Sequence, residues 1–229
     1  MRTVILAISF IFLIFLNATS QSTGFEWAKG ISGSGNVSPS SVETDSDGNI
    51  FVAGEFSGRA DFNPGEDSLF LESHGHDDIF FSKYNSQGQL IWAKNMGENY
   101  NDVCNSMALD ESNNIYITGH FARTVDFDPG NGTHELSVSG GNDIFIAKYD
   151  SAGNFKWATS MGLLNASDEG ISITTDKEGN VLITGWFQGT VDFDPGNTTF
   201  NLTSNGPGCF ILKLSAGGNF IWAKNIDST

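Results

Sequence analysis

Four tryptophans at equal spacing constrain this chain more than any other feature. They stand in the segments FEWAKG, LIWAKN, FKWATS and FIWAKN, and successive tryptophans are 65 residues apart: Trp27, Trp92, Trp157 and Trp222. Glycines, aspartates and lysines keep nearly the same period, among them Gly54, Gly119 and Gly185. Self-similarity at this period predicts a stack or ring of one supersecondary unit, in which each unit completes its core against its neighbours.

The middle copy predicts four principal antiparallel strands per unit. Aromatic and β-branched runs, bounded by Gly, Asn, Asp and Ser, occupy residues 103–110, 115–121, 143–150 and 155–161. A longer excursion, with a short extended piece at 134–138, separates the second strand from the third. This arrangement is typical of a β-propeller blade. We therefore expect an all-β, β-propeller-like fold with three tandem four-stranded blades of about 65 residues, in units of about 28–92, 93–157 and 158–222 within a repeat region of 24–226.

The same segments carry a family resemblance. DSDGNIFVAGEFSG, ESNNIYITGHFARTVDFDPG and KEGNVLITGWFQGTVDFDPG, each followed by a segment such as DIFFSKYNSQGQLIWAK, resemble β-propeller repeats of the SBBP type. The resemblance covers essentially all of residues 24–226 and implies a secreted bacterial protein, often very long and often ending in a type IX secretion sorting domain. It says little about a biochemical role, because one fold serves many functions.

The hairpin ahead of each tryptophan resembles two further motifs. Its spacing, Asp/Asn-x-x-Gly-x-x-x-Trp, is similar to the docking motif of quinoprotein dehydrogenase propellers and to the Asp-box hairpins of sialidases. We interpret both similarities as shared blade mechanics, in which the tryptophan fills the gap between one blade and the next.

Three units are fewer than the four to eight blades, roughly, of closed propellers. An orphan last strand is expected at 25–31, where it belongs to a preceding blade or closes against a final one. A truncated gene product, an oligomer that completes the ring and an open stack all fit the pattern, and we favour truncation or incompleteness. Self-association through unpaired blade faces is the expected consequence.

The N-terminus predicts export. Arg2 precedes an apolar run from Val4 to Leu16, and the segment Ala18-Thr-Ser20 offers a cleavage site before Gln21. Residues 1–20 are therefore predicted to be a signal peptide, with a run too short to span a bilayer, and the protein is expected outside the cell or at its surface. A formal net charge of −16 repels nucleic acid and anionic membranes, so we expect neither partner and no membrane span. The expected partner is a protein or a carbohydrate at the cell surface.

An acidic octapeptide, TVDFDPGN, occurs at 124–131 and again at 190–197, with the looser copy RADFNPGE at 59–66. Ca²⁺ prefers oxygen ligands, which the paired side chains at these loops offer: Asp126 and Asp128, Asp192 and Asp194, and more weakly Asp61 and Asn63. Alternatively, Pro-Gly makes a turn in which the Asp side chains bond the local backbone. We favour the turn and keep Ca²⁺ as the candidate cofactor.

Other polar residues give no catalytic pattern. The segment DSDGN at 45–49 fits a hairpin turn better than an EF-hand loop, and the four histidines share no zinc-ligand spacing: His74, His76, His120 and His134. Paired acids recur in every unit, whereas an active site breaks the symmetry of its scaffold. We therefore expect no enzyme; the alternative is a fragment of a quinoprotein-like dehydrogenase or a glycan-processing propeller enzyme.

Two features depart from the repeat. Trp186 is aligned with His120 and Phe56 of the other copies, and an aromatic side chain beside polar loops can stack on a sugar ring or a partner. A filler of one blade's core is the favoured alternative. Cys104 and Cys209 stand at non-equivalent points, and two independent buried thiols are favoured over a disulfide between them.

Overall fold

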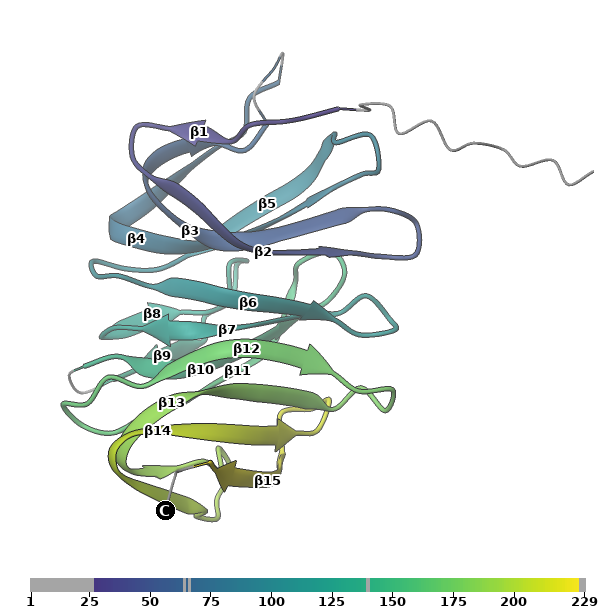
Figure 1. Cartoon of the computed structure of the whole chain (residues 1–229). Helices are drawn as coiled ribbons and strands as arrows, with labels where there is room; N and C mark the ends of the chain where they lie inside the picture. Colours follow the sequence, from purple (N-terminus) through teal and green to yellow (C-terminus); the bar gives the residue numbers. More distant parts are fainter. Residues whose placement is uncertain (1–26, 64, 66, 139–140, 227–229) are drawn as a thin grey trace, which may run out of the picture.

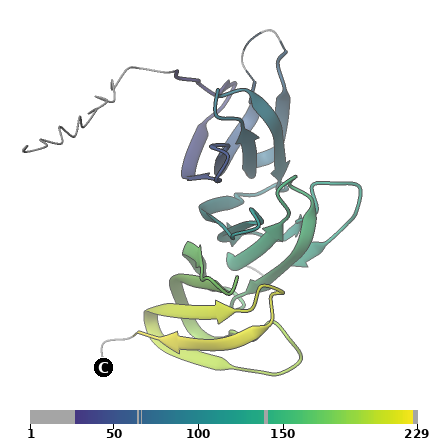
Figure 2. The ribbon, with the colours of Figure 1, turned by 90° about the vertical axis from the view of Figure 1, so that its right-hand side faces the viewer.

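The computed structural model describes residues 27–63, 65, 67–138 and 141–226. The predicted signal peptide, residues 1–20, lies outside this range. The described residues form fifteen β-strands and no helix, and hence no helix long and apolar enough to cross a membrane. Three main sheets, here called blades 1, 2 and 3, follow one another along the molecule (Figure 1), and blades 1 and 3 lie at opposite ends (Figure 2). None of these sheets closes into a ring. The all-β structure with three successive antiparallel sheets confirms the predicted fold class of three propeller-like blades.

Each blade is an antiparallel meander of four principal strands. Blade 1 contains β1 (Ser32–Gly33), β2 (Val37–Thr44), β3 (Ile50–Asp61), β4 (Phe70–Tyr84) and β5 (Leu90–Met96). Blade 2 contains β6 (Val103–Leu109), β7 (Ile115–Phe121), β10 (Asp143–Tyr149) and β11 (Phe155–Met161), with the short pair β8 (Thr124–Asp126) and β9 (Glu135–Ser137). Blade 3 contains β12 (Glu169–Thr175), β13 (Val181–Asp192), β14 (Asn201–Leu214) and β15 (Phe220–Asn225).

The excursion between the second and third strands is a hairpin that extends both of them. In blades 1 and 3 the strands continue through a bulge at Gly58 and Gly189, each with a φ of 70°. Arg123 takes the equivalent left-handed conformation in blade 2, with a φ of 66°, and there the ladder breaks into β7 and β8. Glycine adopts this conformation at little cost, whereas a side chain resists it. The acidic octapeptide therefore lies at the tip of an extension hairpin.

The cores of the blades are shared between neighbours. One buried cluster joins Phe51, Phe81 and Met96 of blade 1 to blade 2, and a second joins Ile146 and Met161 of blade 2 to blade 3. A trio of fully buried phenylalanines recurs in each blade, with neighbouring rings in edge or tilted contact: Phe56, Phe62 and Phe80; Phe121, Phe127 and Phe145; Phe187, Phe193 and Phe210. Because apolar side chains from two blades fill each cluster, stacking itself stabilises the blades.

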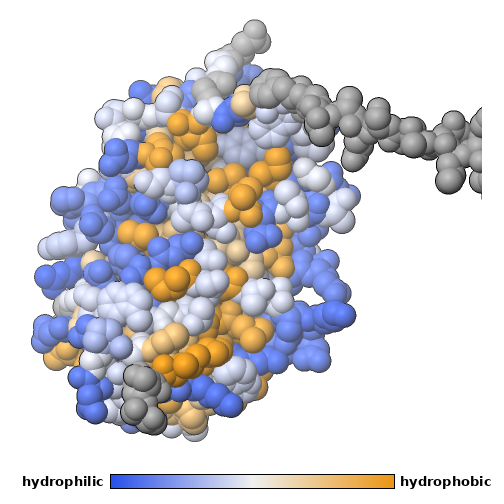
Figure 3. All heavy atoms as spheres, in the orientation of Figure 1, coloured by the Kyte–Doolittle hydropathy of each residue, from blue (hydrophilic) through white to orange (hydrophobic). Residues whose placement is uncertain are grey.

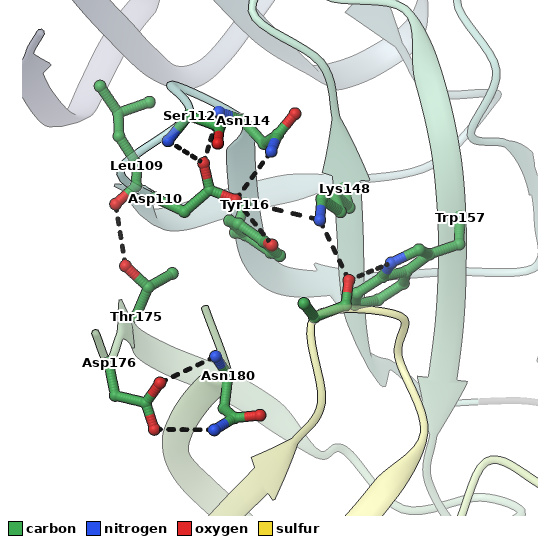
Figure 4. A network of polar contacts seen from close by, with 11 residues as sticks. Leu109, Asp110, Ser112, Asn114, Tyr116, Lys148, Trp157, Thr175, Asp176 and Asn180 are labelled. Carbon is green, nitrogen blue, oxygen red and sulfur yellow. Dashed lines mark hydrogen bonds and ion pairs between the residues drawn. The ribbon is translucent and has the colours of Figure 1, made fainter. Parts of the chain in front are cut away.

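The repeated tryptophan fills the gap between blades, as predicted. Trp157, on the last strand of blade 2, lies over the hairpin turn of blade 3 and donates its indole N–H to the carbonyl of Ala216 at 3.2 Å. Lys148 donates to the same carbonyl at 3.0 Å (Figure 4). A Cβ added to Gly218 would lie 3.1 Å from the Trp157 ring, so only a glycine leaves room for this contact.

Two expectations were wrong. Residues 27–31 form no strand, and chain pairing begins only at β1, whose Ser32 lies opposite Asp61. A last strand needs a third strand beside it, and the described residues offer none on that side. Of the two cysteines, both without a disulfide, Cys104 is buried but Cys209 is exposed, since no blade in the described part of the chain covers its position.

Candidate binding site between the blades

The strand register corrects the alignment of Trp186. The residue directly after each repeated glycine is Glu55 in blade 1, His120 in blade 2 and Trp186 in blade 3, whereas Phe56 corresponds to Phe187. Phe56 and Phe187 are both fully buried. Trp186 is half-buried, so it occupies a variable position rather than a core position.

Glu169, the first residue of β12, contacts the residues at this variable position in both blade 2 and blade 3, His120 and Trp186. One carboxylate oxygen accepts the indole N–H of Trp186 at 3.0 Å. The other lies 3.0 Å from Nδ1 of His120 and accepts from the amide of Asn105 at 2.8 Å. Asn105 also donates to the carbonyl of Gly170 at 2.8 Å. The network fixes the edge of the Trp186 ring and ties blade 2 to blade 3.

His120 lines a hollow of about 250 Å³. A second hollow, of about 390 Å³, lies at the third acidic loop. The smaller hollow is lined by His76, Tyr100, Asn101, His120, Ala122 and Asn142. The Tyr100 ring is 47% exposed, and the Arg123 guanidinium lies 5.3 Å from its centroid. Planar amide and imidazole groups beside an exposed ring suit a sugar or a peptide, because they offer hydrogen bonds at the edge of a stacking surface.

Asp102 positions the wall of this hollow. Its two carboxylate oxygens accept the backbone N–H groups of Glu98, at 2.9 Å, and of Ala122, at 3.1 Å. Burial, with a smaller contribution from the charge of Asp78, raises the pKa of Asp102 to about 7. The side chain is fully buried. The loop that carries Tyr100 is therefore tied to the end of β7 by a group whose charge state changes near neutral pH.

Sequence reasoning missed this hollow. His76 and His120 were weighed only as zinc ligands, and the described residues contain no group of three or more His, Cys, Asp or Glu side chains placed to hold a metal ion. The structure separates the other histidines, with His74 beside Asp78 and His134 against Phe155. The available signal was that the units differ at the positions that line the hollow, which is where a repeat can acquire an individual site.

The acidic octapeptides act as turns. Oδ1 of Asp126 accepts the N–H groups of Asp128 and His134, at 3.0 and 2.8 Å, and Oδ1 of Asp128 accepts that of Gly130. The same bonds recur at Asp192 and Asp194, and Asp61 accepts from Asn63 and Leu69. The phenylalanine between the two acids anchors the loop in the blade core, which explains the conserved spacing within the chain.

A lysine two residues after a repeated tryptophan approaches two of the three loops. Lys29 donates to the side chain of Asn63 at 2.9 Å, and Lys94 lies near enough to Asp128 for the carboxylate to raise its pKa against the larger, opposite effect of burial. At the third loop the equivalent residue is Thr159, which lines the hollow of about 390 Å³ together with Asp194. Calcium binding stays a prediction, and Asp192 and Asp194 are its best place because Thr159 there stands at the position that a lysine occupies beside the other two loops.

Comparison with known proteins agrees with this architecture. The model of the SBBP family, described as a beta-propeller repeat, matches residues 89–120 and 156–186. An uncharacterized WD repeat-containing protein, L264, of Acanthamoeba polyphaga mimivirus is 24% identical over 82% of the chain, and the regulatory protein FlaEY of Caulobacter vibrioides is 24% identical over 77%. The matches cover only 16% and 18% of these relatives. The chain is therefore a propeller-type repeat protein that carries β-propeller repeats of the SBBP type.

Proposed function

We propose that this chain is a non-enzymatic, exported scaffold that binds a carbohydrate or a protein outside the cell or at its surface. One observation carries the proposal: residues that differ between the units gather around one hollow, and an exposed Tyr100 ring stands beside His76, His120 and two asparagines. The rest of each unit is devoted to repeated turns and shared cores, which supply rigid support. The apolar N-terminal run, residues 4–16, supports export.

The chemistry of the hollow favours a neutral or anionic ligand. No carboxylate is found among the described residues that line it, although the chain as a whole has a formal net charge of −16. The positively charged Arg123 guanidinium lies over the Tyr100 ring at the edge of the hollow. A flat ring with such neighbours stacks on the apolar face of a sugar while the amides bond its hydroxyl groups.

A glycan array tests the proposal, with Tyr100→Ala as the diagnostic variant. Phe70→Ala is the matched control, because its ring is 46% exposed and also lies under an arginine, Arg59, at 3.7 Å. We expect the parent chain and the Phe70→Ala variant to bind the printed oligosaccharides, and the Tyr100→Ala variant not to bind them. Equal retention of both variants would place binding elsewhere, and no retention of the parent would leave an immobilised panel of surface proteins as the remaining test.

Export has its own readout. When the full chain is expressed in a bacterium, we expect the protein in the medium or on the cell surface to begin at Gln21, as determined by mass spectrometry of its N-terminus. Retention of residues 1–20 on protein inside the cell would contradict export.

A further inference from the structure

The two contacts between blades are copies of one interface. In each, the side of one blade that faces the next, here the distal face, packs on the proximal face of its neighbour. The distal residues are all buried: Phe51, Phe81 and Met96 in blade 1 and Tyr116, Ile146 and Met161 in blade 2. Polar contacts repeat as well: the backbone N–H of Met107 donates to Ser41, and that of Ile173 donates to Ser106.

The distal face of blade 3 is the same surface, and no blade among the described residues covers it. Its residues at the equivalent positions are Leu182, Ile211 and Ile226, and they line a groove of about 280 Å³. Ile226 is 55% exposed, whereas the equivalent Met96 and Met161 are 4% and 3% exposed. Figure 3 shows hydrophobic side chains at the surface of blade 3, in the lower part of the view.

The proximal face of blade 1 is open in the complementary way. Val42 is 64% exposed, but the equivalent Met107 and Ile173 are 2% and 5% exposed beneath their neighbouring blades. Beside it lies an apolar groove of about 240 Å³, whose lining includes Ile50, Val52 and Tyr84. The described residues thus present, on blades 1 and 3, the two halves of an interface that they already make twice.

Trp27 occupies part of this proximal face. It donates its indole N–H to the carbonyl of Ser86 at 3.1 Å, as Trp157 does to Ala216 at 3.2 Å (Figure 4), and a Cβ added to Gly88 would lie 3.0 Å from its ring. Lys29 donates to the carbonyl of Gly88 as Lys94 does to that of Gly153. The segment around Trp27 therefore imitates the last strand of a preceding blade, but it covers little else and leaves its own ring 40% exposed.

We propose that the distal face of blade 3 binds the proximal face of blade 1 in a second copy of this chain, and that Trp222 of one copy displaces Trp27 from the Gly88 turn of the other. The segments around Trp222 and Trp27 share the letters W-A-K, so both fit the same turn. Two copies carry six blades, within the range of about four to eight found in closed propellers. A pair that makes the contact twice closes on itself and leaves neither face open.

Sedimentation of the purified chain over a range of concentrations tests the pairing. We expect a monomer–dimer equilibrium that Ile226→Lys abolishes and Ile221→Lys preserves. Ile221 is the matched control because it lies on β15, which ends directly before Ile226, and is 43% exposed. Its equivalents Ile91 and Lys156 are exposed as well, so this position faces outward in every unit. Equal behaviour of the two variants, a parent chain that stays monomeric, or polymers larger than a dimer would each overturn the proposal.

The displacement of Trp27 predicts opposite effects for the two tryptophans. Trp222→Ala should weaken dimerisation, whereas Trp27→Ala should strengthen it because it removes the competing segment. Trp27→Ala combined with Ile226→Lys controls for adhesion of the newly bared apolar surface and should remain monomeric. Weaker pairing of Trp27→Ala, or association of the double variant, would contradict the exchange.

Cys209 reports on the same surface without any substitution. It lies on the distal face, where the equivalent Ile79 and Ile144 are fully buried, and it is exposed. Cys104 is fully buried, and burial raises its pKa to about 12, so alkylation by N-ethylmaleimide acts on Cys209 alone. We expect its rate to fall about tenfold once the dimer forms, since thiol reactivity depends on access. A rate independent of protein concentration in a dimeric sample would place the contact on another face.

Discussion

The glycine at the tip of the last hairpin meets two requirements in each blade. Gly88, Gly153 and Gly218 have φ values of 74°, 75° and 80°, in the left-handed region that side chains resist. Each also lies against a tryptophan from the preceding segment. The hairpin and the tryptophan could each be predicted from local spacing. Their contact joins residues 61 positions apart, such as Trp157 and Gly218, so only the stacking of blades makes it visible.

Gly218→Ala should separate these two requirements. Its matched control is Gly179→Ala, with a φ of 76° but no atom nearer than 3.7 Å to an added Cβ. In both variants the left-handed conformation of the new alanine lowers the free energy of unfolding by roughly 1 kcal/mol. Gly218→Ala loses about 1–3 kcal/mol more because the Trp157 ring has to move. Urea unfolding followed by tryptophan fluorescence measures the difference, and equal losses would mean that the tryptophan contact adds no stability.

Asp102 gives the chain a pH dependence of defined sign. Its pKa in the folded protein is raised to about 7 from a model value of 3.8, so the folded state holds the proton more tightly than the unfolded state does. Between these two values stability therefore falls as pH rises, by an amount on the order of a few kcal/mol at most. We expect the melting temperature to decrease from pH 5 to pH 8.

Asp102→Asn should flatten this slope even though the variant loses one backbone acceptor and starts from a lower stability. Asp143, whose pKa burial and the charge of Asp168 raise to about 6, contributes in the lower part of the same pH range and leaves a residual slope. The exposed Asp47→Asn is the control and should leave the slope unchanged. An unchanged slope in Asp102→Asn would assign the pH dependence to other groups.

Among the elements, the strands of the middle blade were predicted closely. The sequence placed strands at 103–110, 115–121, 143–150 and 155–161, and the structure has them at Val103–Leu109, Ile115–Phe121, Asp143–Tyr149 and Phe155–Met161. Alternation and turn residues fix these strands locally. The prediction of a strand at 25–31 was wrong over the described residues 27–31, because a strand depends on a partner that local sequence does not reveal. The hollow at Tyr100 escaped prediction for the same reason, since its lining comes from several strands and loops.

The extension hairpin depends on the first acid of each octapeptide. Asp126 holds two backbone N–H groups, whereas Asp128 holds one in a more exposed place. We expect Asp126→Ala to cost about 1–3 kcal/mol, because two donors lose their acceptor, and Asp128→Ala to cost clearly less. Chemical unfolding measures both variants, and the reverse order would contradict the role of Asp126 as the turn's acceptor.

Calcium is predicted to act at the third loop. Millimolar Ca²⁺ should raise the melting temperature of the parent chain, since a ligand that binds only the folded state stabilises it. Asp194→Asn should remove this shift and Asp128→Asn should preserve it, because Lys94 lies near Asp128 and Thr159 takes the lysine's place near Asp194. A melting temperature that Ca²⁺ does not move would reject the calcium site and leave all three octapeptides as turns.

At the scale of the whole molecule, the three blades are alike in strand order but not in cover. Within residues 27–226, as far as the structure describes them, blade 2 is packed between two blades, whereas no blade covers the proximal face of blade 1 or the distal face of blade 3. Stability in a linear stack is close to a sum of unit and interface contributions. The middle blade should therefore open last.

Hydrogen exchange read by mass spectrometry tests this gradient on equivalent central strands. In dilute monomer, the amides of β7 should exchange more slowly than those of Ile50–Phe56 in β3 and Val181–Phe187 in β13, because local opening exposes less-covered units first. Trp157→Ala should speed exchange in β13 and leave β3 unchanged, since it weakens only the contact between blades 2 and 3. Raising the protein concentration should instead slow β3 and β13 together, as each open end gains a neighbour from the second copy. Uniform protection of all three strands in the monomer would mean that the stack unfolds as a single cooperative unit, against the additive behaviour expected of repeats.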